Sequence, residues 1–234
     1  MKLFDNYDQS IEFDIDPKYK RLAVNCSGGA DSSILLFMVA KFIKDKNFLD
    51  TKISVLTCSN DFKHRWNARK AADVINYTIN KLEFNPFDMH YAYYRDKQDT
   101  KYFREVEFSL FKDNRTDLII SGITSNPLGD DIIIKDANGK QVNLHETGLG
   151  DRNTGGLAPT FVTGLDGCWY LPFINVDKRF VASMYKQYDI MDMLDLTRSC
   201  EAVPKHTEYK SEFETKPCGT CWWCLERKWA FGKF

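Results

Sequence analysis

The chain has 234 residues, of which 43% are hydrophobic and 28% charged, and its formal net charge at pH 7 is −1. These values are typical of a folded globular protein and exclude disordered and collagen-like chains. A nearly neutral chain has no overall field that attracts nucleic acid, so we expect small-molecule partners and no nucleic-acid partner. The sequence contains no run of about 18 apolar residues, so no membrane span is predicted. The first residues lack the apolar core of a signal peptide, so we expect a cytoplasmic location.

Short apolar segments alternate with helical segments through the first half of the chain. Strands are predicted at residues 21–26, 52–58, 89–94 and 117–122. Helices are predicted at residues 30–43, 61–82 and 100–112, and again over about 176–194. Residues 1–20 show no clear periodicity of apolar residues. The alternation predicts an α/β fold with a parallel sheet covered by helices on both faces.

The alternation breaks between residues 125 and 167, which are rich in Gly, Asn and Asp. Asn138-Gly139 lies between two short apolar runs and predicts a β-hairpin with a two-residue turn. The stretch 148–156 has no period, and a long stretch of this kind is usually functional or disordered. We therefore predict a main domain over 1–195, whose irregular insertion at 125–167 belongs to the substrate region, and a small C-terminal lobe over 196–234.

Ser27-Gly28-Gly29 connects the first predicted buried strand to an apolar helix. Glycine lets successive backbone N–H groups point at one anion, and a helix N-terminus adds positive potential. Ser27 and Ser32 add hydroxyl donors, and Asp31 could hold a metal ion or orient a ligand. The segment matches neither the Walker A loop nor the dinucleotide fingerprint. It predicts a phosphate site, the alternative being a tight turn in which glycine only permits close packing.

Four of the seven cysteines lie in the last 35 residues, at Cys200, Cys218, Cys221 and Cys224. Thiolates at Cys-x-x-Cys spacing can point at one centre, as tetrahedral Zn²⁺ requires, so we predict a closed structural zinc site. An iron–sulfur cluster and a redox pair are alternatives, whereas a disulfide is disfavoured in a reducing compartment. His206 could replace Cys200 as the fourth ligand.

Six further residues carry less specific expectations. Cys26 and Cys58 are expected to be small packing residues rather than nucleophiles, and Cys168 is expected to be a packing residue as well. Three tryptophans near the C-terminus could stack on nucleic-acid bases. We expect them instead to pack the C-terminal lobe against the sheet; they are Trp222, Trp223 and Trp229.

Ser27-Gly28-Gly29-Ala30-Asp31-Ser32 resembles the Ser-Gly-Gly-x-Asp-Ser signature of the PP-loop ATP pyrophosphatases. Together with the cysteine pattern it resembles the 7-cyano-7-deazaguanine synthase family. Further segments are similar to that family's motifs: Asp61-Phe62-Lys63-His64-Arg65, with its basic pair reversed; Leu171-Pro172-Phe173 followed by Lys178; and Thr197-Arg198-Ser199-Cys200 with the segment 218–227.

The resemblance implies an adenine nucleotide alpha hydrolase-like, Rossmann-like fold and a ligase that uses ATP, Mg²⁺ and Zn²⁺. In the family reaction the carboxylate of 7-carboxy-7-deazaguanine attacks the α-phosphate of ATP, and pyrophosphate leaves. Ammonia displaces AMP to give an amide, and a second activation gives the nitrile. By position, the resemblance assigns phosphate binding to Ser27, Gly28, Gly29, Asp31 and Ser32.

The resemblance also places backbone near Thr57 and Cys58 against adenine. It implies catalytic roles for Asp31 and Lys178, although Lys178 could equally be an ordinary solvated lysine. Family members often form homodimers, so a homodimer is possible here.

The chain departs from the family pattern at the substrate loop. An Asp-Cys-Arg tripeptide that the family commonly carries after the fourth strand is absent. Asp151 and Arg152 could replace it, a carboxylate for guanine-like N–H donors and a guanidinium for a carboxylate, or could belong to a solvated loop. The gap between Cys200 and Cys218 is also long. These departures leave open an enzyme that stops at the amide or uses another amine, a PP-loop tRNA-modifying enzyme, and a zinc-ribbon nucleic-acid binder.

Overall fold

The structure is a computed structural model and describes residues 1–60, 66–95, 100–127, 132–144, 161–164, 167–200 and 216–234. The strands are β1 Lys2–Phe4, β2 Ser10–Glu12, β3 Arg21–Asn25, β4 Lys52–Asn60, β5 Phe87–Arg95, β6 Leu118–Ser121, β7 Ile133–Lys135, β8 Gln141–Asn143, β9 Phe161–Gly164 and β10 Gly167–Tyr170. The helices are α1 Ala30–Asp45, α2 Asn67–Leu82, α3 Thr100–Lys112, α4 Lys178–Gln187, α5 Met193–Leu196 and α6 Trp222–Phe231. Within these ranges no helix is both long enough and apolar enough to cross a membrane.

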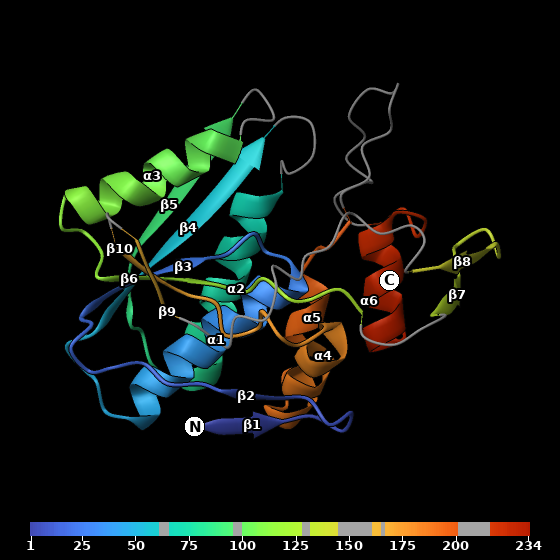
Figure 1. Cartoon of the computed structure of the whole chain (residues 1–234), viewed down its shortest axis with the longest axis horizontal. Helices are drawn as coiled ribbons and strands as arrows, with labels where there is room; N and C mark the ends of the chain where they lie inside the picture. Colours follow the sequence, from blue (N-terminus) through green and yellow to red (C-terminus); the bar gives the residue numbers. More distant parts are fainter. Residues whose placement is uncertain (61–65, 96–99, 128–131, 145–160, 165–166, 201–215) are drawn as a thin grey trace.

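Six strands form one sheet in the order β5-β4-β3-β6-β10-β9 (Figure 1). The strands from β5 to β10 are parallel, and β9 pairs antiparallel with β10 at one edge. This confirms the predicted α/β fold with a parallel sheet. From β3 the chain builds β4 and β5 on one side and later β6 and β10 on the other. The strand order therefore reverses between β3 and β6, and in such sheets ligands bind beyond the carboxyl ends of the strands at this point.

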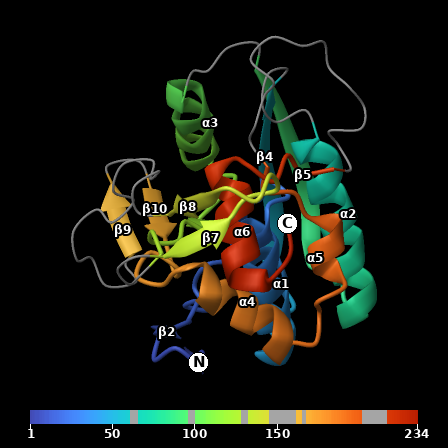
Figure 2. The same ribbon diagram turned by 90° about the vertical axis from the view of Figure 1, so that its right-hand side faces the viewer.

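The two faces of the sheet are covered by different helices. Leu22 and Val24 of β3 belong to the large core that α1, α2 and α4 complete, whereas Ala23 faces the smaller core under α3. In that smaller core Phe111 of α3 meets the ring of Trp169 edge to face, with centroids 5.1 Å apart. Figure 2 shows α3 on one side of β4 and β5, with α1 and α2 on the other. The alternation of side chains along each strand thus explains the three-layer arrangement.

The C-terminal lobe and the β7–β8 hairpin pack on each other. The hairpin was predicted, but its turn is longer than two residues. The carboxylate of Asp136 accepts the backbone N–H groups of Asn138 and Lys140, and Gly139 has φ +80°. An Asp side chain that closes the loop in this way accommodates five residues, 136–140, between the strand ends.

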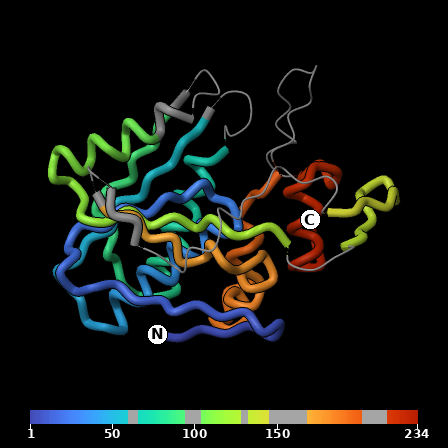
Figure 3. The backbone as a smooth tube through the Cα atoms, in the orientation of Figure 1, coloured from blue at the N-terminus to red at the C-terminus, as the bar shows by residue number. Residues whose placement is uncertain are grey.

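The tryptophans of the C-terminal lobe contact this hairpin, so the expectation that they pack against the sheet was wrong. Trp222 Nε1 donates to the Leu144 carbonyl at 3.1 Å, and Trp223 and Trp229 lie in the same apolar cluster. Figure 3 shows the chain ending in this lobe beside the hairpin, whereas the β1–β2 hairpin runs along α4. Both ends of the chain also reach α4, because the guanidinium of Arg179 lies over the rings of Tyr7 and Trp229.

Several elements differ from the sequence prediction. β9 lies inside the range 125–167 that was expected to be irregular, and β1, β2, β10 and α6 were not predicted. The helix predicted over 176–194 is two helices. Asp189 has φ +52°, and the N–H of Ile190 returns to the Tyr185 carbonyl at 3.0 Å. This is a left-handed C-terminal cap that ends α4 and redirects the chain. α2 begins at Asn67, and the predicted helical residues 61–65 lie outside the described part of the chain.

Candidate functional site

A cavity of about 520 Å³ opens at the carboxyl ends of β3, β4 and β6. Pockets for small molecules commonly measure roughly 300–1,000 Å³. The walls come from the strand ends, the loop after β3 and the C-terminal lobe, and they include Asn25, Cys26, Ser27, Gly29, Asp31, Ser32, Leu56, Cys58, Trp66, Arg104, Ser121, Gly122, Lys178, Arg198 and Trp223. The cavity therefore occupies the crevice that the reversal of strand order predicts.

The loop after β3 is held by its own hydroxyl groups. Ser32 Oγ accepts the N–H of Ser27 at 3.1 Å, and Ser27 Oγ accepts the N–H of Gly29 at 3.3 Å. Gly29 is the N-cap of α1, and no side chain caps this helix terminus. The loop thus brings two hydroxyls and an uncapped helix N-terminus to the cavity, which is the arrangement that favours an anion.

Gly28 fixes the shape of this loop by its backbone and by its contact with α2. Its φ is +72°, and a Cβ placed there would lie 2.4 Å from Lys70 Cβ. The sequence motif places two glycines in the loop, and the structure shows that the first one also permits close packing. The close packing that the sequence allowed for is therefore present, and the phosphate site stays a prediction.

We expect Gly28→Ala to lower the free energy of unfolding by roughly 1–3 kcal/mol, because it adds a clash with α2 to the strain of a left-handed alanine. Urea denaturation at constant protein concentration measures the change. Gly139→Ala is the matched control, since Gly139 has φ +80° and no atom within 4 Å of an added Cβ. Equal losses in the two variants would show that the contact with α2 adds nothing.

Lys178 lies between two carboxylates at the wall of the cavity. Its Nζ is 2.6 Å from Asp31 Oδ2 and 3.1 Å from Glu226 Oε2, and only 3% of the lysine side chain is exposed. The carboxylate of Asp177 caps α4 by accepting the N–H of Arg179 at 2.8 Å, which fixes Lys178 in the first turn. The interpretation of Lys178 as a solvated lysine is therefore wrong.

Glu226 is the member of this group that the sequence did not reveal. It is fully buried in α6, next to Arg227 and Lys228 in the chain. A charged residue in such a polar run ordinarily faces solvent, so no local pattern marks it. Its position means that the C-terminal lobe contributes a buried carboxylate that pairs with Lys178, which lines the cavity.

Asp31 has one oxygen that fits a cation. Oδ2 pairs with Lys178, whereas Oδ1 is buried and has no hydrogen-bond partner in the described part of the chain. Mg²⁺ is bound through carboxylate oxygens together with substrate phosphates. The side chain thus suits a magnesium ion shared with a phosphate ligand.

The two residues expected near adenine differ in position. Cys58 lines the cavity, whereas Thr57 is fully buried. Thr57 Oγ1 donates to the Cys26 carbonyl at 2.7 Å and lies 2.9 Å from His90 Nε2. Cys26 is buried as well, and burial raises the pKa of its thiol to about 11, which suits a packing residue rather than a nucleophile.

Burial lowers the pKa of His90 below its ordinary value of 6.5. The unfolded chain therefore binds more protons than the folded chain just below pH 6.5. The stability that neutral His90 contributes is present above this pH, and it is lost as the pH falls towards the lowered pKa. We expect His90→Gln to reduce the dependence of unfolding free energy on pH between about 5 and 7.5. Denaturant titrations across this range measure the slope, and an unchanged slope would contradict the assignment.

Polar and aromatic side chains that the sequence did not single out complete the wall. Asn25 Nδ2 donates to Glu107 Oε1 at 2.8 Å, and burial raises the pKa of the Glu107 carboxyl. The guanidinium of Arg198 stacks on Trp66, 4.9 Å from the ring centroid. The candidate residues Asp151 and Arg152 lie outside the described residues, as does the segment 61–65.

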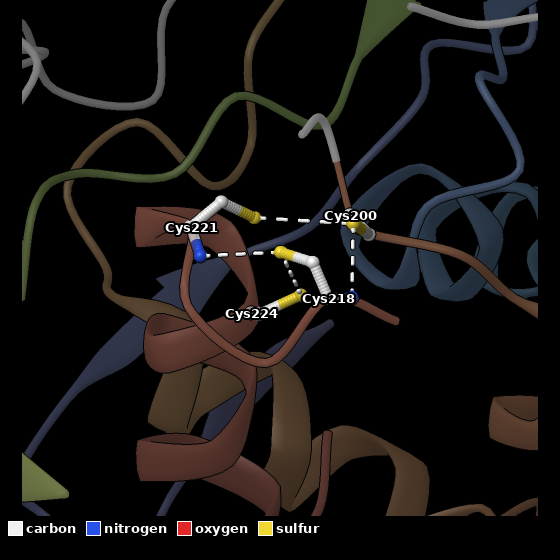
Figure 4. Close-up of side chains that lie close together, drawn as sticks. All are labelled: Cys200, Cys218, Cys221 and Cys224. Carbon is white, nitrogen blue, oxygen red and sulfur yellow. Dashed lines mark hydrogen bonds between the residues drawn. The ribbon is translucent and has the colours of Figure 1, made fainter. Parts of the chain in front are cut away.

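The four C-terminal cysteines meet at one point, as Figure 4 shows. All four Sγ atoms lie within 4.8 Å of one another. The Sγ atoms of Cys218 and Cys224 are 3.9 Å apart, and those of Cys221 and Cys200 are 4.0 Å apart. A tetrahedral zinc ion with Zn–S bonds of about 2.3 Å needs sulfurs about 3.8 Å apart.

These distances fit a single metal ion. An iron–sulfur cluster binds its thiolates through different iron atoms and needs sulfurs farther apart. Cys200 supplies the fourth sulfur, and the alternative ligand His206 lies outside the described residues. The cluster can therefore hold zinc with four thiolates and leaves no ligand position open, which is the pattern of a structural site.

The turn that carries Cys218 and Cys221 is shaped for this purpose. Gly219 has φ +70°, and its carbonyl accepts the N–H of Ala137 from the hairpin at 3.0 Å. The N–H of Cys221 points at Cys218 Sγ, 3.3 Å away. Hydrogen bonds from the neighbouring thiols, that of Cys200 first, lower the pKa of the Cys218 thiol and favour the thiolate that binds metal.

No family model matches the chain, and no curated protein matches it. Among solved structures, the chain is similar to the NMN synthetase from Francisella tularensis, with 12% sequence identity and a TM-score of 0.43. The similarity covers 94% of this chain and 88% of the synthetase. A similarity of this extent assigns no activity, so function has to be inferred from the cavity and the cysteine cluster.

Proposed function

We propose that the protein is an ATP-dependent ligase of the PP-loop ATP pyrophosphatase superfamily that forms AMP and pyrophosphate. Its proposed substrate is 7-carboxy-7-deazaguanine, which ammonia and ATP convert to 7-cyano-7-deazaguanine. One observation carries this proposal: the segment Ser27–Ser32, Asp31 and Lys178 meet at the cavity beyond β3, and the four-cysteine cluster lies beside them. The loop motif and the cysteine motif thus serve a single site.

Different residues of the cavity would have different roles in the reaction with ATP. The hydroxyls of Ser27 and Ser32 and the N-terminus of α1 would bind the phosphates of ATP. Asp31 would hold Mg²⁺ through Oδ1, and the bound ion neutralises phosphate charge. Lys178, buried against Asp31 and Glu226, keeps a positive charge at the wall where the leaving pyrophosphate would gain negative charge.

The remaining wall suits a planar heterocycle with a carboxylate. Trp66 and Trp223 offer aromatic surface, and Arg198 offers a guanidinium in the same cavity. In the reaction, a carboxylate oxygen attacks the α-phosphate and pyrophosphate leaves. Ammonia then adds to the acyl adenylate, AMP leaves with that oxygen, and a proton is released. The amide oxygen would then attack the α-phosphate of a second ATP and pyrophosphate would leave; loss of AMP with that oxygen and of the two amide protons gives the nitrile.

The test is incubation of the full chain with ATP, Mg²⁺, ammonia and 7-carboxy-7-deazaguanine, followed by chromatography of nucleotides and mass spectrometry of the product. We expect AMP, pyrophosphate and the mass of the nitrile. Detection of the amide, or of a conjugate with another amine, would support the proposed ATP chemistry and assign a different product. Absence of AMP, with an active control enzyme in the same buffer, would overturn the proposal.

Asp31→Asn is the matched variant, because it keeps the size of the side chain and removes the charge that would hold Mg²⁺. We expect it to abolish AMP formation. Asp45→Asn is the control, since Asp45 lies at the other end of α1 and forms a surface ion pair with Lys41.

A further inference from the structure

The two carboxylates beside Lys178 differ in their access to the large cavity. The side chain of Asp31 is 20% exposed and lines the cavity, whereas that of Glu226 is fully buried and is not among the lining residues. Lys178 Nζ lies 2.6 Å from Asp31 Oδ2 and 3.1 Å from Glu226 Oε2. A ligand in the cavity can therefore meet the first carboxylate, whereas the second stays behind the lysine.

Contacts between α1, α4 and α6 fix the positions of these three side chains. α4 and α6 pack against each other (Figure 1). The ring of Tyr185 in α4 meets that of Phe231 in α6 edge to face, with centroids 5.4 Å apart. The hydroxyl of Tyr185 also donates to the Ala30 carbonyl at 3.0 Å, beside Asp31 in α1. The ammonium and both carboxylates are thus in place before a ligand binds.

Stability alone does not explain a second carboxylate at this lysine. A buried ion pair often stabilises a protein no more than apolar side chains of similar size, because removing the charges from water is costly. The charge of Glu226 therefore suits a role in the chemistry of the cavity, which it can exert only through Lys178.

Binding of a magnesium–nucleotide complex at Asp31 would weaken the contact between Asp31 and Lys178, because a carboxylate that binds Mg²⁺ attracts an ammonium less strongly. Only 3% of the lysine side chain is exposed, so water compensates poorly for the weakened contact. Glu226 would keep a carboxylate beside the ammonium in this state. It would thereby lower the free-energy cost of binding the complex.

We propose that Glu226 is a positioning residue for nucleotide binding, which keeps the Lys178 ammonium at the cavity wall while Asp31 binds the magnesium ion of the complex. This role rests on the proposed function. Glu226 acts through Lys178 and touches neither the nucleotide nor the ion. The role also links the C-terminal lobe to the ATP site, because α6 carries Glu226 two positions after Cys224 of the cysteine cluster.

Glu226→Gln tests this role, because it keeps the size of the side chain and removes its charge. Isothermal titration of the zinc-loaded full chain with a non-hydrolysable ATP analogue is carried out with Mg²⁺ and without Mg²⁺. With Mg²⁺ present, we expect the variant to bind the analogue about tenfold more weakly than the wild type, as for two coupled sites. Without Mg²⁺ the contact between Asp31 and Lys178 persists, so the two proteins should bind the analogue alike.

Glu12→Gln is the matched control, since Glu12 is exposed on β2 and the substitution removes the same charge. It should leave both affinities unchanged. Glu226→Asp keeps the charge on a shorter side chain and should show a smaller loss in Mg²⁺ alone, which gives a result if Glu226→Gln fails to fold.

The outcomes separate this role from a structural one and from the proposed function. An equal loss of affinity with and without Mg²⁺ would show that Glu226 only supports the packing, and this result or an unchanged affinity in Mg²⁺ would overturn the proposal. A wild type that does not bind the analogue in Mg²⁺ would overturn the proposed function and this role together.

Discussion

Replacement of Lys178 by methionine should lower the free energy of unfolding by roughly 3–5 kcal/mol. The substitution removes the ammonium that lies 3.1 Å from the fully buried carboxylate of Glu226 and 2.6 Å from Asp31. A buried charge that loses an ionic partner is costly, because burial removes the water that would otherwise solvate it. Guanidinium denaturation of the metal-loaded protein measures the change.

A double variant shows whether the loss of stability comes from the broken Lys178–Glu226 ion pair or from altered packing. Lys178→Met combined with Glu226→Leu should be more stable than Lys178→Met alone, because the buried carboxylate is removed together with the ammonium. Lys41→Met is the surface control, since Lys41 and Asp45 form an exposed pair on α1 and its loss should change stability little. If the double variant were as unstable as the single one, the ion pair would not explain the loss.

Cys221→Ser should abolish stoichiometric metal binding and unfold the C-terminal lobe. The binding free energy of a structural zinc ion contributes directly to folding, and three ligands hold zinc far less well than four. We expect about one zinc per chain in the wild type, in line with a four-ligand site. Elemental analysis and thermal unfolding measure both effects.

The same substitution should also reduce ATP turnover, because the lobe supplies Trp223 to the cavity wall and Glu226 as the buried partner of Lys178. Cys168→Ser is the control, since Cys168 is a free thiol on β10 near Tyr19 and lies outside the cluster. A Cys221→Ser protein that keeps its zinc, or a wild type that contains none, would contradict the assignment of the metal site.

Local patterns were sufficient to predict the strands and helices that form the first half of the sheet. β3, α1 and β4 follow from apolar runs bounded by Gly or polar residues, and the Ser27–Ser32 segment follows from its position between strand and helix. The cysteine spacing likewise predicted the sulfur cluster, because Cys-x-x-Cys restricts where two sulfurs can lie.

Features that depend on distant parts of the chain were not predictable in this way. β10 is only four residues long, and it is a strand because Trp169 pairs with Ile119 of β6. The role of Glu226 depends on its approach to Lys178, 48 positions earlier in the chain, and no periodicity shows that contact.

The central claim is that this cavity activates a carboxylate with ATP, and oxygen transfer tests it most directly. The protein is incubated with ATP, Mg²⁺, ammonia and 7-carboxy-7-deazaguanine that carries ¹⁸O in its carboxylate, and the AMP is examined by mass spectrometry. Because the attacking carboxylate oxygen stays on the α-phosphate, the account predicts AMP with one heavy oxygen. AMP without ¹⁸O, or ADP and phosphate in place of AMP and pyrophosphate, would contradict it.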